Sequence, residues 1–226
     1  MLRTLLIAAA VSANAAFAGL AVVFDYPDVL DRPAVEVLDS FNANQPAVPL
    51  LFLLLAAAAA LLAPIALGLA RRAVNPRAAR LIVALGIAAA VVQVIGLLRW
   101  PLIVPFLTDP AALSTLSTVL GTILGETAGY LLTAAFTLTV VRALPGPRPT
   151  ISWLGTASAA LIATGILVPL HIPGADLANF AGYLLWSAWL IALAVTARAT
   201  PRVGRWIEPA RSAVSRSGQG TGSGCP

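Results

Sequence analysis

The sequence predicts an all-α membrane protein, a polytopic bundle of six transmembrane helices with both termini in the cytoplasm. Three observations support this prediction. The 226 residues are 59% hydrophobic and only 10% charged, whereas a soluble domain has about 25% charged residues. The apolar residues form six continuous runs, each long enough to cross ~30 Å of hydrocarbon as a helix. The loops between the runs alternate between basic and acidic, which orients the helices.

Continuous apolar runs favour helices over a β-barrel, whose strands alternate in hydrophobicity. The predicted spans are Leu5–Val23, Val48–Ala70, Leu81–Leu107, Leu120–Val141, Ile151–Leu170 and Leu177–Thr196. They form one membrane domain over residues 1–198. Residues 199–226 are basic and rich in Gly and Ser, so we expect a largely disordered cytoplasmic tail.

Loop charges predict the orientation. One side carries Arg3, Arg71, Arg72, Arg77, Arg80, Arg142 and Arg148, and the other carries acidic residues with Arg32 as its only loop arginine. The basic side is expected in the cytoplasm, with the protein in a bacterial inner membrane. Residues 1–18 also resemble a cleaved signal peptide, but the apolar run continues to Val23, which favours an uncleaved helix.

The first acidic loop, "FDYPDVLDRPAVEVLDSFNANQPAVP", is the longest. Asp31 is a candidate N-cap, and Ala34, Val37, Leu38 and Phe41 then share one helical face. We predict a short amphipathic helix over the mouth of the bundle, with a simple spacer as the alternative.

Composition excludes several classes of function. All 14 basic residues are arginines, and apart from Arg99 they lie in short loops, at span ends or in the C-terminal tail. This is the pattern of topology signals, so no nucleic-acid partner is expected. The only cysteine is Cys225 and the only histidine is His171, so no metal site, cofactor or catalytic residue is predicted. The predicted partners are the lipid bilayer and another membrane protein or a second copy of the chain.

Two charged residues interrupt the apolar runs. Arg99 lies ~28 Å along its helix from Arg80, and Glu126 lies ~24 Å from Arg142, at 1.5 Å per residue. The two are therefore at similar depth near the outer edge of the hydrocarbon. Pairing would reduce the cost of burying both charges. The alternatives are separate snorkelling to the surface and a direct role in binding a ligand.

Other polar residues are expected near this pair. Glu126, Tyr130, Thr133 and Thr137 share one helical face. The string "AGYLL" begins at Ala128 and recurs at 181–185, which suggests a faint repeat in which Asn179 and Tyr183 match Glu126 and Tyr130. The predicted polar cluster is Arg99, Glu126, Tyr130, His171, Asn179 and Tyr183. It is either a ligand pocket open to the outside or a structural ring that fixes helix register.

Beside this stripe, Gly121, Gly125 and Gly129 form a GxxxGxxxG pattern. Small residues at this spacing let two membrane helices approach closely. We therefore predict a helix-packing face here.

The strings "FDYPDVL" (Phe24–Leu30), "RWPLIVP" (Arg99–Pro105) and "GE" (Gly125–Glu126) give the chain a resemblance to a known family. The chain resembles small bacterial six-helix integral membrane proteins catalogued only as a domain of unknown function. The resemblance implies the six-helix fold and a bacterial inner membrane, and no activity.

Three classes of function fit the sequence. The first is a non-enzymatic accessory or regulatory membrane subunit, which the glycine pattern and the few polar residues favour. The second is a small-solute binding or transport protein with an outward-facing polar pocket. The third is a membrane enzyme, although the sequence contains none of the catalytic motifs considered.

Overall fold

The computed structural model describes residues 1–145 and 149–196, and these residues contain helices and no strands. Six stretches are long and apolar enough to span a membrane: Leu2–Phe24, Ala47–Ala70, Pro76–Phe106, Pro110–Ala143, Pro149–Leu170 and Ala175–Thr196. Each overlaps one predicted span, so the all-α class with six spans is confirmed. The predicted tail at 199–226 lies outside the described residues.

The spans are built from shorter elements. In chain order these are α1 (Leu2–Phe24), η1 (Asp28–Asp31), α2 (Ala34–Ala43), α3 (Ala47–Ala60), α4 (Leu62–Ala70), α5 (Pro76–Leu102), η2 (Val104–Phe106), α6 (Pro110–Leu116), η3 (Ser117–Ala128), α7 (Gly129–Ala143), α8 (Pro149–Ala163), η4 (Thr164–Leu170) and α9 (Ala175–Thr196). Of these, η1, η2 and η4 are 3₁₀-helices and η3 is a π-helix.

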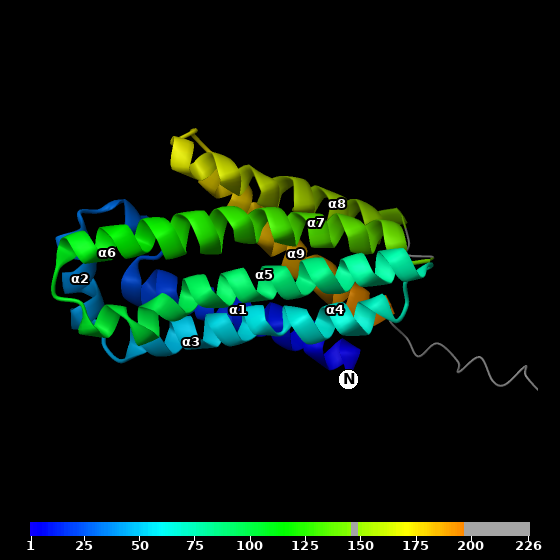
Figure 1. Ribbon diagram of the computed structural model, residues 1–226, viewed down its shortest axis with the longest axis horizontal. Helices are drawn as coiled ribbons and strands as arrows, with labels where there is room; N and C mark the ends of the chain where they lie inside the picture. Colours follow the sequence, from blue (N-terminus) through cyan, green and yellow to red (C-terminus); the bar gives the residue numbers. More distant parts are fainter. Residues whose placement is uncertain (146–148, 197–226) are drawn as a thin grey trace, which may run out of the picture. The chain divides into compact units, whose positions relative to one another are not determined.

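The six spans close into a ring in chain order. Helix α1 packs against α3 and α9, α3 and α4 pack against α5, α5 against η3 and α7, α7 against α8, and α8 against α9. The α4–α5 turn lies beside the end of α7, where the Val74 N–H donates to the Ala143 carbonyl at 3.0 Å. Figure 1 shows this end opposite the end that holds α2 and α6.

The two ends of the bundle carry opposite charge. We call one the arginine end, which in the described residues carries Arg3, Arg71, Arg72, Arg77, Arg80 and Arg142. We call the other the acidic end, which carries Asp25, Asp28, Asp31, Glu36, Asp39, Asp109 and Asp176. Within the described chain, the one ion pair joins Arg32 to Asp25 at the acidic end.

Aromatic side chains fill the centre of the acidic end. The Trp100 ring stacks on Phe52 with centroids 4.9 Å apart and meets the edge of Phe24 at 5.2 Å. Helix α2 covers these rings with Val37, Leu38 and Phe41, all buried. The predicted amphipathic helix is thus confirmed, and apolar burial explains why it docks here.

The predicted cap of this helix is wrong. Asp31 ends η1, and α2 begins at Ala34 after Pro33, without a capping side chain. Pro33 is itself the residue before the first helical position, and its side chain has no oxygen that could accept from the free N–H groups of the first turn.

A second apolar core fills the half of the bundle nearest the arginine end. It joins α1, α4, α5, α7, α8 and α9 around Leu6, Ile65, Ile82, Phe136 and Trp189. Polar side chains lie between this core and the acidic end, and they form the candidate site.

Candidate functional site

Hydrogen bonds link α5, α7 and α9 at mid-depth. The Gln93 side-chain amide donates to the Thr133 hydroxyl at 2.7 Å. The Trp186 indole N–H donates to the Thr137 hydroxyl at 2.9 Å. Thr133 and Thr137 belong to the stripe predicted on the fourth span, and both are buried. Polar side chains that hydrogen-bond across helices are a common way of holding membrane bundles together.

A third hydrogen bond continues this layer to α1. The Asn14 amide donates to the Ser187 hydroxyl of α9 at 2.8 Å and to the Ala10 carbonyl at 2.7 Å. Sequence reasoning missed Asn14 and Ser187, although a polar residue in the middle of an apolar span is the signal that could have identified them. We call the whole set the polar belt: Asn14, Gln93, Thr133, Thr137, Trp186 and Ser187.

The bond between Thr137 and Trp186 should be measurable by a double-mutant cycle. We expect Thr137→Val and Trp186→Phe to couple by about 0.6 kcal/mol, and by no more than ~1.7 kcal/mol, because membrane hydrogen bonds of this kind are weak. Equilibrium unfolding in mixed micelles gives the values. Thr139→Val is the control, since Thr139 donates only within its own helix, to the Ala135 carbonyl. Equal coupling of Trp186→Phe to both threonine variants would contradict the assignment.

Arg99 lies deep in the protein, and the residue is only 4% exposed. Its Nη1 donates to the Gly96 carbonyl of its own helix at 2.5 Å, and its guanidinium lies 5.2 Å from the centre of the Trp100 ring. Its Nε has no hydrogen-bond partner. Snorkelling of Arg99 to the surface is therefore wrong, because the side chain folds back along α5 into the bundle.

The predicted Arg99–Glu126 ion pair is not formed among the described residues. Glu126 is half-buried on η3, and its carboxylate is not within ion-pair distance of the guanidinium. The guanidinium instead occupies the space left by Gly121, where an added Cβ would lie 2.7 Å from Nη2 and 2.9 Å from Cζ. The buried guanidinium is therefore accommodated by the space beside a glycine and not by pairing with a carboxylate.

The three glycines of the predicted packing face all lie against α5. Gly121 faces Arg99, Gly125 faces Gly96, and Gly129 faces the Gln93 side chain. The closest approach is between backbones, since a Cβ on Gly96 would lie 2.7 Å from the Gly125 Cα. We call this contact the glycine seam.

The first half of the seam is not α-helical. Residues Ser117–Ala128 form a π-helix, and regular α-helix begins only at Gly129. The face predicted to run from Glu126 to Tyr130 assumed α-helical spacing. That spacing begins only at Gly129, so the prediction holds for residues from Gly129 onward and not for Glu126. π-Helical turns are rare and frequently mark functional sites, and here they coincide with the glycine contacts to Arg99 and Gly96.

The structure brings three more of the predicted residues together between α7, η4 and α9. The rings of Tyr130 and Tyr183 meet edge to face, 5.9 Å apart. The Asn179 amide donates to the Ile162 carbonyl at 2.7 Å. A Cβ on Gly165 would lie 2.2 Å from Tyr130 and 2.3 Å from Asn179. This part of the cluster is tightly packed.

Tyr26, just beyond α1, was not predicted as part of the cluster. Burial raises the pKa of its phenol, the Glu126 carboxylate adds to the rise, and Arg99 opposes it. Tyr26 therefore lies within electrostatic reach of both charged residues and stays protonated at neutral pH. Tyr26 lies in "FDYP", outside any predicted span, so the sequence did not predict that it folds back toward Arg99 and Glu126.

His171 lies apart from the cluster. It is exposed at the end of η4, where its φ of 52° places it in the left-handed region and ends the helix. A single exposed turn residue offers no support for a proton-carrying role. In the described residues no three His, Cys, Asp or Glu side chains gather as metal ligands.

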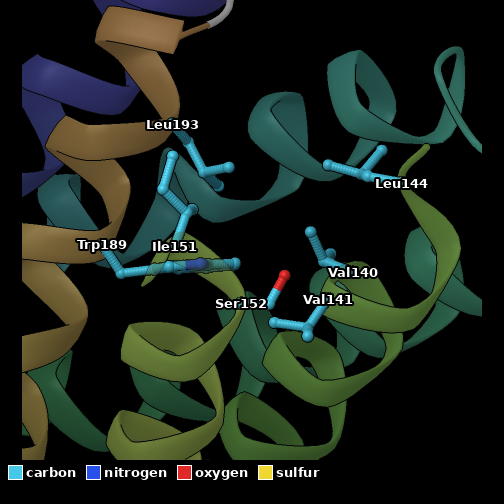
Figure 2. A pocket seen from close by; sticks show the side chains of 7 residues that line it. All are labelled: Val140, Val141, Leu144, Ile151, Ser152, Trp189 and Leu193. Atoms are coloured by element: carbon cyan, nitrogen blue, oxygen red, sulfur yellow. The ribbon is translucent and has the colours of Figure 1, made fainter. Parts of the chain in front are cut away.

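A small cavity lies elsewhere. Figure 2 shows it between α7, α8 and α9, near the arginine end. Its volume is about 10 Å³, and its lining is apolar except for Ser152. This is about the size of one water molecule, so the cavity is a packing gap and not a ligand site.

Six apolar spans, a polar belt and a glycine seam define a multi-pass integral membrane protein. A sequence comparison adds the family. Residues 4–194 match the family described as Domain of unknown function (DUF4386), and the chain belongs to that family. No curated protein and no solved structure matches the chain.

Proposed function

We propose that this chain is a non-enzymatic accessory or regulatory subunit that works through helix contacts within a membrane assembly. The observation that supports it is the tight packing around Gly165, where Tyr130 and Asn179 leave no room even for a methyl group. A solute carrier needs a water-accessible space at such a cluster. A packed cluster instead suits a rigid scaffold that presents its outer surface to a partner.

We also propose a location and an orientation. The arginine end lies in the cytoplasm of a bacterial cell and the acidic end faces outward across the inner membrane. The support is the separation of charge, with six arginines and no acidic residue at one end of the described chain. Cysteine-labelling on intact cells would test it, with single cysteines introduced after Cys225 is replaced by serine. Labelling at Asp109→Cys and protection at Arg71→Cys are expected, and the reverse would overturn the orientation.

The test of the accessory role is in-cell photo-crosslinking at native expression level. A photoreactive residue replaces one exposed side chain on each of three faces: Leu54 on α3, Ile123 on η3 or Ile191 on α9. We expect one face to give a single discrete adduct with a second protein, while the other two give lipid adducts. Lipid adducts alone at all three positions would overturn the proposal, and so would the same mixture of proteins at all three.

A second candidate is the binding of a small polar solute at Arg99. The observation that favours it is the Nε of this buried guanidinium, which has no protein partner although buried donors are normally satisfied. Native mass spectrometry of gently extracted protein would test it. A non-lipid mass present on the wild type and absent from Arg99→Met is expected, and identical spectra would exclude it.

A further inference from the structure

The arginine end holds a concentration of unpaired positive charge. Among residues 1–145 and 149–196 it has six arginines and no acidic side chain, and none of the six is in an ion pair. Guanidinium groups bind phosphate oxygens through two parallel hydrogen bonds. This end is therefore suited to phosphate-bearing groups.

Two of these arginines border a shallow groove at the start of α5. The groove is lined by Arg77, Arg80, Leu81 and Ala84 and has a volume of about 340 Å³. Arg77 and Arg80 are each three or four residues from Leu81 or Ala84, so the four positions share one face of the helix. All four are exposed. The small side chain of Ala84 leaves the hollow between its larger neighbours.

The same face continues along the span as an apolar strip. Leu81, Ile87, Val91 and Ile95 are 50%, 39%, 49% and 43% exposed. From Leu81 to Ile95 the strip is ~21 Å long at 1.5 Å per residue. Half of a ~30 Å hydrocarbon core is ~15 Å, so the strip is long enough for an acyl chain within one leaflet.

We infer that this groove binds an anionic phospholipid, with the phosphate between Arg77 and Arg80 and an acyl chain along the strip from Leu81. Charge and shape together favour this occupant, because two guanidinium groups lie where the apolar span begins and an exposed apolar strip runs from them along the span. The first turn of α5, capped by the Asn75 side chain, adds the partial positive charge of a helix N-terminus.

Native mass spectrometry of the full chain, titrated with phosphatidylglycerol, tests the site. The test variant is Arg77→Gln/Arg80→Gln. The matched control is Arg71→Gln/Arg72→Gln, which removes the same charge from the same end. We expect the dissociation constant to rise about 30-fold in the test variant and little in the control. Phosphatidylcholine should bind all three proteins equally weakly.

Equal losses in both double variants would overturn the inference, because the arginine end would then attract anionic lipid only as a diffuse field. An unchanged affinity in the test variant would also overturn it. Ala84→Trp provides a separate check that keeps every arginine. It fills the hollow on an exposed face, so the protein should fold normally and bind phosphatidylglycerol less well. Unaltered binding by Ala84→Trp would show that the groove is not the lipid site.

Discussion

Gly96→Ala is expected to destabilise the protein by roughly 1–3 kcal/mol, the usual cost of overpacking a tight interior. The added Cβ would lie 2.7 Å from the Gly125 Cα and 2.9 Å from the Leu120 carbonyl oxygen. Both are backbone atoms, which cannot turn aside as a side chain does. The methyl group therefore forces α5 and η3 apart along the glycine seam. Alanine's higher helix propensity offsets part of this cost, by about 0.5–1 kcal/mol.

Gly19→Ala is the matched control for that variant. Its Cβ would also lie 2.7 Å from a neighbour, but the neighbour is the end of the Leu51 side chain. Leu51 can change rotamer, so we expect a stability within about 1 kcal/mol of wild type. Unfolding in mixed micelles, followed by circular dichroism, measures both. If the two variants lose equal stability, the seam is not a backbone contact.

The fold could be predicted because the signals that determine it are local and large. Each span is a continuous apolar run, and each loop carries its own charges, so span number and fold class needed no knowledge of contacts. Helix α2 could be predicted for the same reason, since its apolar positions repeat with the helical period. The caps were harder, because α2 begins after Pro33 with no capping side chain, and Asp31 belongs to η1.

The site could be predicted only in part. Depth along a helix can be calculated by counting residues, so the sequence predicted similar membrane depths for Arg99 and Glu126. The direction in which each side chain points depends on the number of residues per turn of the helix. No sequence pattern predicted the π-helix at Ser117–Ala128, so the direction of Glu126 could not be predicted. A helix-packing face could be anticipated from the glycines, but not that its partner is α5. Their alignment with Gly96, Arg99 and Gln93 depends on the register between two helices, which sequence periodicity leaves open.

Replacing Arg99 separates the effect of its charge from the effect of its volume. Arg99→Met keeps much of the length and removes a buried charge that makes one hydrogen bond to protein. We expect the Met variant to be more stable than wild type by about 1 kcal/mol or more, because buried charges with poor partners lose more solvation than they gain. Arg99→Ala leaves a cavity beside Gly121, so it should be about 2–5 kcal/mol less stable than the Met variant.

A double-mutant cycle of Arg99→Met with Glu126→Gln then tests how the two charges interact. Breaking a direct buried ion pair costs about 3–5 kcal/mol, whereas we expect a coupling below about 1 kcal/mol, since the guanidinium bonds to Gly96 and not to Glu126. A coupling near 3 kcal/mol would mean that the pair predicted from the sequence does form in the membrane. If Arg99→Met instead loses stability while the coupling stays small, the guanidinium must gain its stabilisation from other groups, such as the Trp100 ring 5.2 Å away or a bound solute. Repeating the cycle with Trp100→Leu distinguishes these two, because only the ring interaction is lost with the tryptophan.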